Sequence, residues 1–237
     1  MTAADHRGTG NRARRRFILG TFTALAIANP VGVAIGSSSL EWWTKPLLMP
    51  MLIGLVVTSG GLAHHHARLM VFGLAAATVA DIALLIPDEP AFLVGMGFFL
   101  VMQACYIRVF IGLGALPKVM GRRWIVAVPA AVLAAFFIPL WNSLGPLAAP
   151  MLVYGVALAA MAVFATGLST RAGVGGVLFL ISDLLIGVNV ADLDFPGRGP
   201  IIMATYVLAQ YLLVTGWLQR SGADQRHTAT GRNITAA

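Results

Sequence analysis

The sequence predicts an all-α fold, a polytopic membrane bundle of eight transmembrane helices. The 237-residue chain is 58% hydrophobic and only 11% charged, whereas soluble domains carry roughly 25% charged residues. Long apolar runs separated by short polar connectors recur along the whole chain. A membrane-spanning helix needs about 20 mostly apolar residues, so lipid is the natural solvent for most of this protein.

Each apolar run is long enough to form a helix, and none alternates as a barrel strand does. Helices also satisfy their own backbone groups where no water is present. The predicted spans cover residues 17–36, 46–62, 69–87, 91–114, 124–141, 147–168, 172–190 and 200–219. Residues 17–219 therefore form one transmembrane domain. We expect residues 1–16 to be a disordered basic cytoplasmic tail and residues 221–237 to be a disordered cytoplasmic tail.

The distribution of lysine and arginine predicts that both termini are cytoplasmic, an N-in/C-in topology. With this orientation thirteen basic residues lie on the cytoplasmic side, and only Lys45 and Arg198 lie on the other side. Cytoplasmic loops carry such an excess of positive charge. The five tryptophans are predicted at the membrane interfaces, Trp217 among them at the end of the last span. The net charge of +7 therefore indicates topology control in the plasma membrane, not nucleic-acid binding.

A weak internal echo favours a 4+4 parallel pseudo-repeat. Asp81 is followed by an apolar stretch, a connector and a span with Gln103 and Tyr106. Asp183 is followed in the same way by a span with Tyr206 and Gln210. Four helices in each half would relate the halves by an axis along the membrane normal. Chance patterning in an apolar sequence is the alternative.

Asp81 and Asp183 are the candidate catalytic residues, because only these two of the nine acidic residues lie inside predicted spans. An aspartate at mid-membrane costs roughly 2.5–3.5 kcal/mol on insertion scales, so a partner, water or protonation must offset the cost. Asp81 lies about six residues and Asp183 about seven residues from the outer end of its span. Both are thus expected roughly 10 Å below the outer boundary. A structural hydrogen bond between helices is the alternative role.

Other polar side chains occur at compatible depths and form a candidate substrate-binding set. Lys45 begins the second predicted span on the outer side, where it would hold a lipid phosphate as a point charge or snorkel as a plain cation. The set comprises Lys45, Asn29, Gln103, Tyr106, Ser182, Tyr206 and Gln210. Taken singly, each such group is more often an interhelical hydrogen-bonding partner or an interface anchor.

The sequence offers no sign of a metal or another cofactor. All five histidines lie in the tails or in the connector at 64–66, so no span supplies a histidine ligand for zinc. No G-x-S-x-G nucleophile motif occurs, and the single cysteine, Cys105, has no base beside it in sequence. Paired carboxyls are the remaining acid–base chemistry.

The order of several short motifs resembles that of the YhhN family, bacterial membrane proteins related to animal lysoplasmalogenases. The resemblance covers roughly residues 20–219. Its motifs are Thr44-Lys45-Pro46-Leu47, the Asp81 helix, Gly95 with Phe98-Phe99 and Tyr106, Gly176 with Phe179 and Ser182-Asp183, and Tyr206 with Ala209-Gln210. Two positions depart from the family pattern: Ala80 precedes Asp81 where many members have glycine, and Gln103 stands where many have histidine.

The resemblance implies hydrolysis of the vinyl ether bond of a lysoplasmalogen to a fatty aldehyde and a glycerophospho-base. One aspartic acid would protonate the vinyl carbon, and the other, ionised, would stabilise the cation and activate water. The sequence leaves open which aspartate has which role. It also leaves open the physiological lysophospholipid or ether lipid, the effect of Gln103 and the oligomeric state. The alternatives to a hydrolase are a proton-coupled secondary transporter and a non-catalytic membrane protein.

Overall fold

The computed structural model describes residues 3–64 and 66–235, and the side chains of residues 11–60, 62–64 and 66–222. Within these residues the fold is all-α, with nine α-helices and two single-turn 3₁₀ helices. In chain order they are α1 (Ala3–Ala34), α2 (Ser38–Thr58), η1 (Gly61–Ala63), α3 (Ala67–Ala83), α4 (Glu89–Gly112), α5 (Ala115–Met120), α6 (Arg123–Leu144), η2 (Gly145–Leu147), α7 (Ala148–Leu168), α8 (Thr170–Val190) and α9 (Arg198–Thr235). The predicted all-α class is therefore confirmed for these residues.

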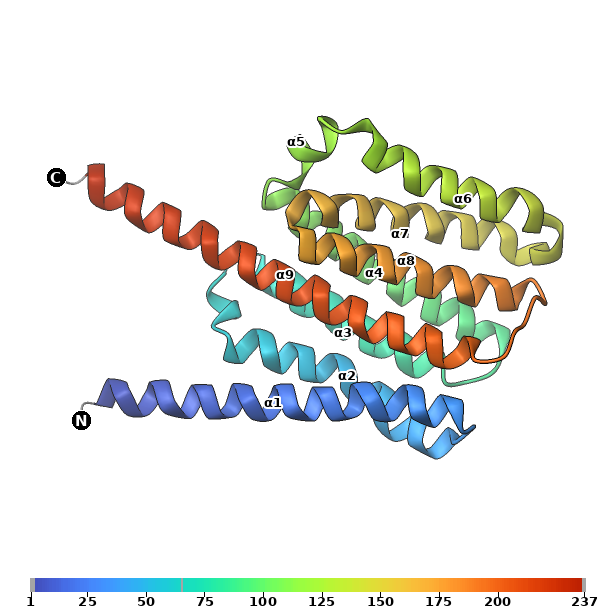
Figure 1. Cartoon of the computed structure of the whole chain (residues 1–237), viewed down its shortest axis with the longest axis horizontal. Helices are drawn as coiled ribbons and strands as arrows, with labels where there is room; N and C mark the ends of the chain where they lie inside the picture. The colour runs from blue at the N-terminus through green and yellow to red at the C-terminus, as the bar shows by residue number, and fades with distance from the viewer. Residues whose placement is uncertain (1–2, 65, 236–237) are drawn as a thin grey trace.

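The eight long helices lie roughly parallel or antiparallel in one bundle, as Figure 1 shows. Helix α7 packs against α4, α6 and α8, and α9 packs against α8 and α1. Helices α1, α2, α3 and α4 each pack on the next, so α1 and α6 lie at opposite edges of the bundle. The first turns of α1 and the last turns of α9 lie at the same end of the molecule (Figure 1).

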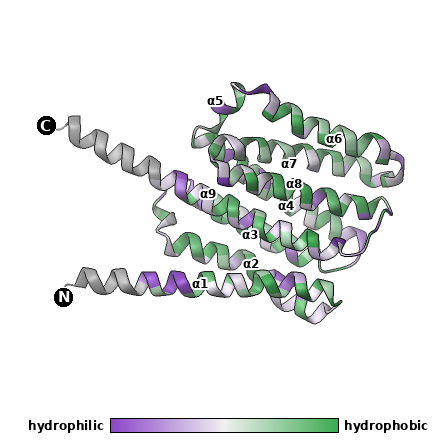
Figure 2. Ribbon diagram, viewed as in Figure 1, coloured by the Kyte–Doolittle hydropathy of each residue, from purple (hydrophilic) through white to green (hydrophobic). Residues whose placement is uncertain are grey.

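By length and hydropathy, six segments of the described residues are able to cross a membrane. They are Asn11–Ala34, Ser38–Thr58, Glu89–Gly112, Arg123–Leu168, Thr170–Val190 and Arg198–Gly222. The fourth segment contains two helices, α6 and α7, which η2 joins. Figure 2 shows that hydrophobic residues dominate the helices and that polar residues gather at helix ends and connectors. The protein is thus a multi-pass membrane protein.

Two boundaries that bear on the site differ from the predicted spans. Helix α2 begins at Ser38 instead of residue 46, because Ser37 caps it and Pro46 is accommodated within the helix. Helix α3 ends at Ala83 instead of residue 87, since Pro87 follows and a proline disfavours helix in the residue before it. Consequently Lys45 lies about two turns inside α2, and Asp81 lies two residues from the end of α3.

Helix α1 extends as helix through residues 11–16, where the sequence analysis expects disorder. Arginine is a good helix former, and adding a residue to an existing helix gains one hydrogen bond for each residue ordered. The described backbone of the C-terminal segment likewise continues α9. The disorder expected for the two tails in solution stays a prediction, and residues 1–2 and 236–237 lie outside the described residues.

Trp217 also differs from its predicted interfacial position. Its side chain is fully buried in the bundle, and its ring meets that of His64 edge to face at 6.0 Å. The other four tryptophans are at least partly exposed. The connector that carries His64 therefore covers the indole and removes it from the lipid interface.

Side-chain caps fix the start of three helices. Ser37 accepts a hydrogen bond from the Leu40 amide, Asp88 from the Ala91 amide and Ser169 from the Ala172 amide. Such caps satisfy amides that have no partner within the helix, and each contributes about 1 kcal/mol in soluble proteins. The Asp88 cap explains the sharp reversal between α3 and α4, which places the end of the Asp81 helix beside the start of α4.

Candidate functional site

Asp81 lies in the interior of the bundle, where its side chain is 1% exposed. Its Oδ2 atom accepts a hydrogen bond of 2.8 Å from the Tyr206 hydroxyl on α9. Its Oδ1 atom is buried without a hydrogen-bond partner among the described residues. An unpaired buried carboxyl oxygen is costly, so this atom is free to bind a proton, a water molecule or a substrate group.

Asp183 lies on α8 and lines a small pocket between helices. The Tyr154 hydroxyl on α7 donates a hydrogen bond to its Oδ2 atom. The pocket has a volume of about 40 Å³. Its other lining residues are mostly apolar: Leu84, Phe92, Met96, Phe99, Met151, Tyr154 and Ile186. Asp183 is therefore the carboxyl that a hydrocarbon ligand in this pocket would meet.

Three aromatic rings connect the surroundings of the two carboxyls. Phe99, Phe179 and Tyr206 pack edge to face, with ring centroids 5.5–5.9 Å apart. Phe99 also lines the Asp183 pocket, and Tyr206 donates to Asp81. The two aspartates thus lie around one aromatic cluster built from α4, α8 and α9.

Lys45 on α2 interacts electrostatically with both Asp81 and Asp183, and the two carboxyls interact with each other. Because α2 begins earlier than predicted, Lys45 lies within the helix instead of at its outer end. The site therefore combines two carboxyl groups and one cation, although no ion pair among the described residues joins them.

Tyr106 and Gln210 form further buried hydrogen bonds near the Asp81–Tyr206 pair. The Tyr106 hydroxyl donates to the Gln210 side-chain oxygen at 3.0 Å, and the Gln210 amide group donates to the Met102 sulfur at 3.1 Å. Tyr106 and Gln210 are both fully buried. Gln210 lies one helical turn from Tyr206 on α9, so the structure brings together Asp81, Tyr206, Gln210 and Tyr106.

Gln103 lies near the Tyr154 hydroxyl but outside hydrogen-bonding geometry. Its side chain is completely buried, and both its amide nitrogen and its oxygen have no hydrogen-bond partner among the described residues. A buried primary amide beside the Tyr154 hydroxyl is suited to orient a water molecule or a substrate oxygen.

Asn29 and Ser182 have interhelical partners instead. The Asn29 amide donates to the Thr44 hydroxyl at 2.8 Å, which joins α1 to α2 next to Lys45. The Ser182 hydroxyl donates to the Ile202 carbonyl at 3.0 Å, which joins α8 to α9. These bonds give Asn29 and Ser182 positioning roles for their neighbours in sequence and space. Their predicted role in binding substrate stays a prediction.

Tyr154 is the residue that the sequence reasoning missed. It is one of four tyrosines. The signal that could have identified it is its hydroxyl, a polar group within the apolar run 147–168. No neighbouring motif marks its partner, because α7 and α8 bring Tyr154 and Asp183 together only through tertiary packing.

Comparison with known protein families gives one match. The model of the YhhN family matches residues 40–217, which contain all of the site residues above except Asn29. No curated protein and no solved structure is similar enough to count as a match. Because the match covers most of the chain, this protein belongs to the YhhN family.

Proposed function

We propose that this protein is a membrane-embedded hydrolase that cleaves the vinyl ether bond of a lysoplasmalogen or a similar lysolipid. The observation that carries the proposal is the pair of aspartates around one aromatic cluster: Asp183 lines an apolar pocket, and Asp81 has a buried carboxyl oxygen without a partner among the described residues. Family membership supports the reaction class. Burial within a membrane protein suits a substrate whose reacting bond lies next to its hydrocarbon chain.

The two carboxyls divide the chemistry. Protonated Asp183, which faces the pocket, transfers its proton to the vinyl carbon farther from the ether oxygen, and the C=C π electrons form the new C–H bond. The resulting oxocarbenium ion is stabilised by ionised Asp81 and Tyr206. Water then adds to the cationic carbon as Asp81 accepts its proton. As the hemiacetal collapses, its hydroxyl proton passes to Asp183 and Asp81 returns a proton to the leaving ether oxygen. The products are a fatty aldehyde and an alcohol, the glycerophospho-base, and both carboxyls regain their starting states.

The reaction is tested on purified protein in detergent with three matched lipids. A lysoplasmalogen should release aldehyde, whereas the saturated alkyl ether analogue and the acyl ester analogue should not, because neither offers a vinyl carbon to protonate. In deuterated water the product, trapped at once by reduction, should carry one deuterium on the carbon next to the former aldehyde. Absence of aldehyde together with lipid-driven proton movement in proteoliposomes would favour the transporter instead.

Loss of either tyrosine hydroxyl should slow the reaction without unfolding the protein. We expect Tyr154→Phe and Tyr206→Phe each to lower kcat/KM about 10- to 100-fold, since hydrogen bonds to charged groups contribute about 1.5–3 kcal/mol. Thr205→Val is the matched control on α9, because the Thr205 hydroxyl bonds only to carbonyls of its own helix. Equal losses in all three variants would contradict a role at the carboxyls.

We further propose eight spans with both termini in the cytoplasm. The count assigns separate crossings to α3, α6 and α7, and the lysine and arginine distribution supports the orientation. Both extended helix ends lie at one end of the bundle (Figure 1), as an even number of spans requires.

Cysteine labelling tests this orientation, since the only native cysteine, Cys105, is buried. In spheroplasts a membrane-impermeant maleimide should label Asp194→Cys, in the connector before α9, without permeabilisation. Arg122→Cys, in the connector between α5 and α6, should react only after permeabilisation. The reverse pattern would invert the topology, and the native chain provides the unlabelled control.

A further inference from the structure

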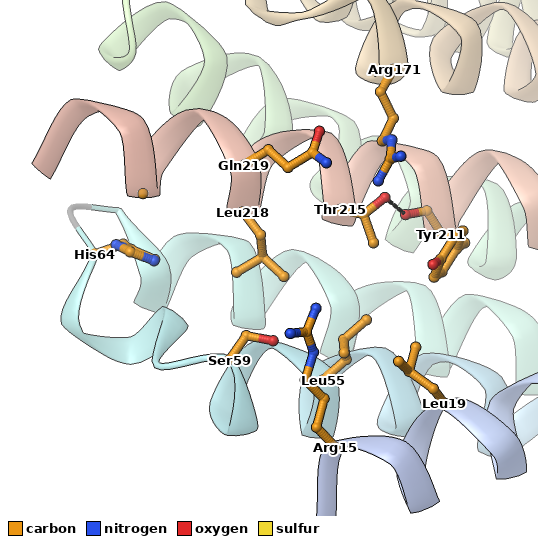
Figure 3. Close-up of a pocket in the computed structure, with 11 residues that line it drawn as sticks. Arg15, Leu19, Leu55, Ser59, His64, Arg171, Tyr211, Thr215, Leu218 and Gln219 are labelled. Carbon is orange, nitrogen blue, oxygen red and sulfur yellow. Dashed lines mark hydrogen bonds between the residues drawn. The ribbon is translucent and has the colours of Figure 1, made fainter. Parts of the chain in front are cut away.

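A second hollow lies at the end of the bundle that carries both extended helix ends. It has a volume of about 550 Å³ and is walled by α1, α2, α8 and α9. Figure 3 shows Arg15 from α1 and Arg171 from α8 extending into it from opposite sides, with Ser59 and His64 at its edge. Arg171 and Asp183 are separated by twelve positions on α8, about 18 Å along the helix axis, so this hollow is separate from the carboxyl site.

The hollow is cationic and offers unused hydrogen-bonding groups. None of the side chains that the structure describes around it is a carboxylate, and the one ion pair formed within the described residues joins Arg198 to Asp194 elsewhere. The Ser59 hydroxyl and the His64 Nδ1 atom are buried without a partner in the part of the chain that the structure describes. Two guanidinium groups with a hydroxyl between helices match a phosphate, which arginine binds through paired N–H donors.

An apolar groove continues from this hollow along the outside of the bundle. It runs between α1 and α9, has a volume of about 500 Å³ and shares two lining residues, Leu19 and Tyr211, with the cationic hollow. Phe22, Ile27 and Leu208 are among its other walls. From Leu19 to Ile27 it follows α1 for about 12 Å. A cationic hollow joined to an apolar groove matches an amphiphile with a phosphate head.

We propose that a phospholipid binds here, with its phosphate held by Arg15 and Arg171 and an acyl chain in the groove between α1 and α9. The lipid bridges three helices, and it secures α1, which lies at the edge of the bundle and is mostly exposed within its span. This is a structural lipid site on the terminal side of the protein, independent of the proposed hydrolase activity.

Lipid binding to the delipidated full chain in detergent, measured by native mass spectrometry, tests the proposal. The probes are dioleoyl phosphatidylglycerol, dioleoylglycerol with the same chains but no phosphate, and glycerol phosphate with no chains. We expect the phospholipid to bind most tightly. Arg15→Gln and Arg171→Gln should each weaken its binding about tenfold, as expected for the loss of one charge-assisted hydrogen bond.

Two further variants separate the site from general charge and from folding defects. Arg12→Gln with Arg14→Gln removes two positive charges from exposed positions of α1, one more than either single arginine variant, and should leave lipid binding unchanged. Ala204→Phe, at an exposed groove position on α9, should weaken phospholipid binding but not glycerol phosphate binding. If the arginine variants fail to fold, two other measurements test the proposal: the effect of Ala204→Phe, and the preference of the native protein for phospholipid over dioleoylglycerol.

Three results would overturn the proposal. They are equal weakening by the Arg12/Arg14 control, equal affinity for dioleoylglycerol and the phospholipid, and phospholipid binding that the Arg15 and Arg171 substitutions leave intact. Glycerol phosphate binding as tightly as the phospholipid would replace the lipid with a water-soluble phosphate ligand and overturn the acyl-chain half.

Discussion

Replacing Asp81 and Asp183 together with asparagine should abolish aldehyde release from a lysoplasmalogen. General acid–base catalysis by a positioned side chain contributes about 10²–10⁴-fold, and asparagine neither donates nor accepts a proton near neutral pH. Each single substitution should cost nearly as much as the pair, because acid and base act on one reaction sequence and their effects are not additive. The measurement is kcat/KM for aldehyde formation by purified protein in detergent.

Asp192→Asn is the matched control for these substitutions. Asp192 lies in the connector between α8 and α9 with a positive φ of 59°, a conformation that asparagine also tolerates. It lies outside the pocket that Asp183 lines, so this variant should keep full activity. Aldehyde release at the native rate by the double variant, with an unchanged elution profile, would refute the carboxyl mechanism.

Replacing Gly176 with leucine should cause the largest loss of stability among the substitutions considered. A Cβ atom at Gly176 would lie 2.7 Å from the Ala162 Cα on α7, and backbone cannot move aside as a flexible side chain can. Overpacking of this kind costs about 1–3 kcal/mol, and at 3 kcal/mol it lowers Tm by roughly 6–12 °C in a chain of this size. Thermal unfolding in detergent measures the shift.

Gly97→Ala is the control for the Gly176 substitution. Gly97 lies within α4, and no atom comes within 4 Å of a Cβ placed there. Alanine forms helix better than glycine by about 1 kcal/mol in water, so this variant should unfold at an equal or higher temperature. A similar decrease in Tm for both variants would show that the close approach of α7 and α8 is not the cause of the destabilisation.

The hydrophobic pattern is sufficient to predict the order of the helices, because membrane insertion constrains each span by its own residues. The boundaries of the helices depend on local capping and turn residues, which the hydrophobic pattern does not show. Ser37 starts α2 eight residues before its apolar run, and Pro87 stops α3 within its run. These shifts place Lys45 within α2 and Asp81 two residues from the end of α3, whereas Asp183 lies seven residues from the end of α8. Counting residues to the helix ends therefore no longer gives the two aspartates the same depth.

The candidate site was predictable in its ionisable members and less so in their partners. A charged residue in an apolar span is rare enough to stand out, so Asp81 and Asp183 were found. The partner of Asp183 is Tyr154 on a different helix. A single sequence does not show which faces of two helices pack against each other. For the same reason the interhelical hydrogen bonds of Asn29 and Ser182 were not predictable, and their role in binding substrate stays a prediction.

The position of Lys45 has a consequence for the resting charge of the protein interior. One ammonium group acts on two carboxyls, so the three groups sum to zero only when a single proton is held between the carboxyls. Net charge at membrane depth is expensive, which favours this electroneutral state before any lipid arrives. In the proposed mechanism, this state would supply one acid and one base before the substrate binds.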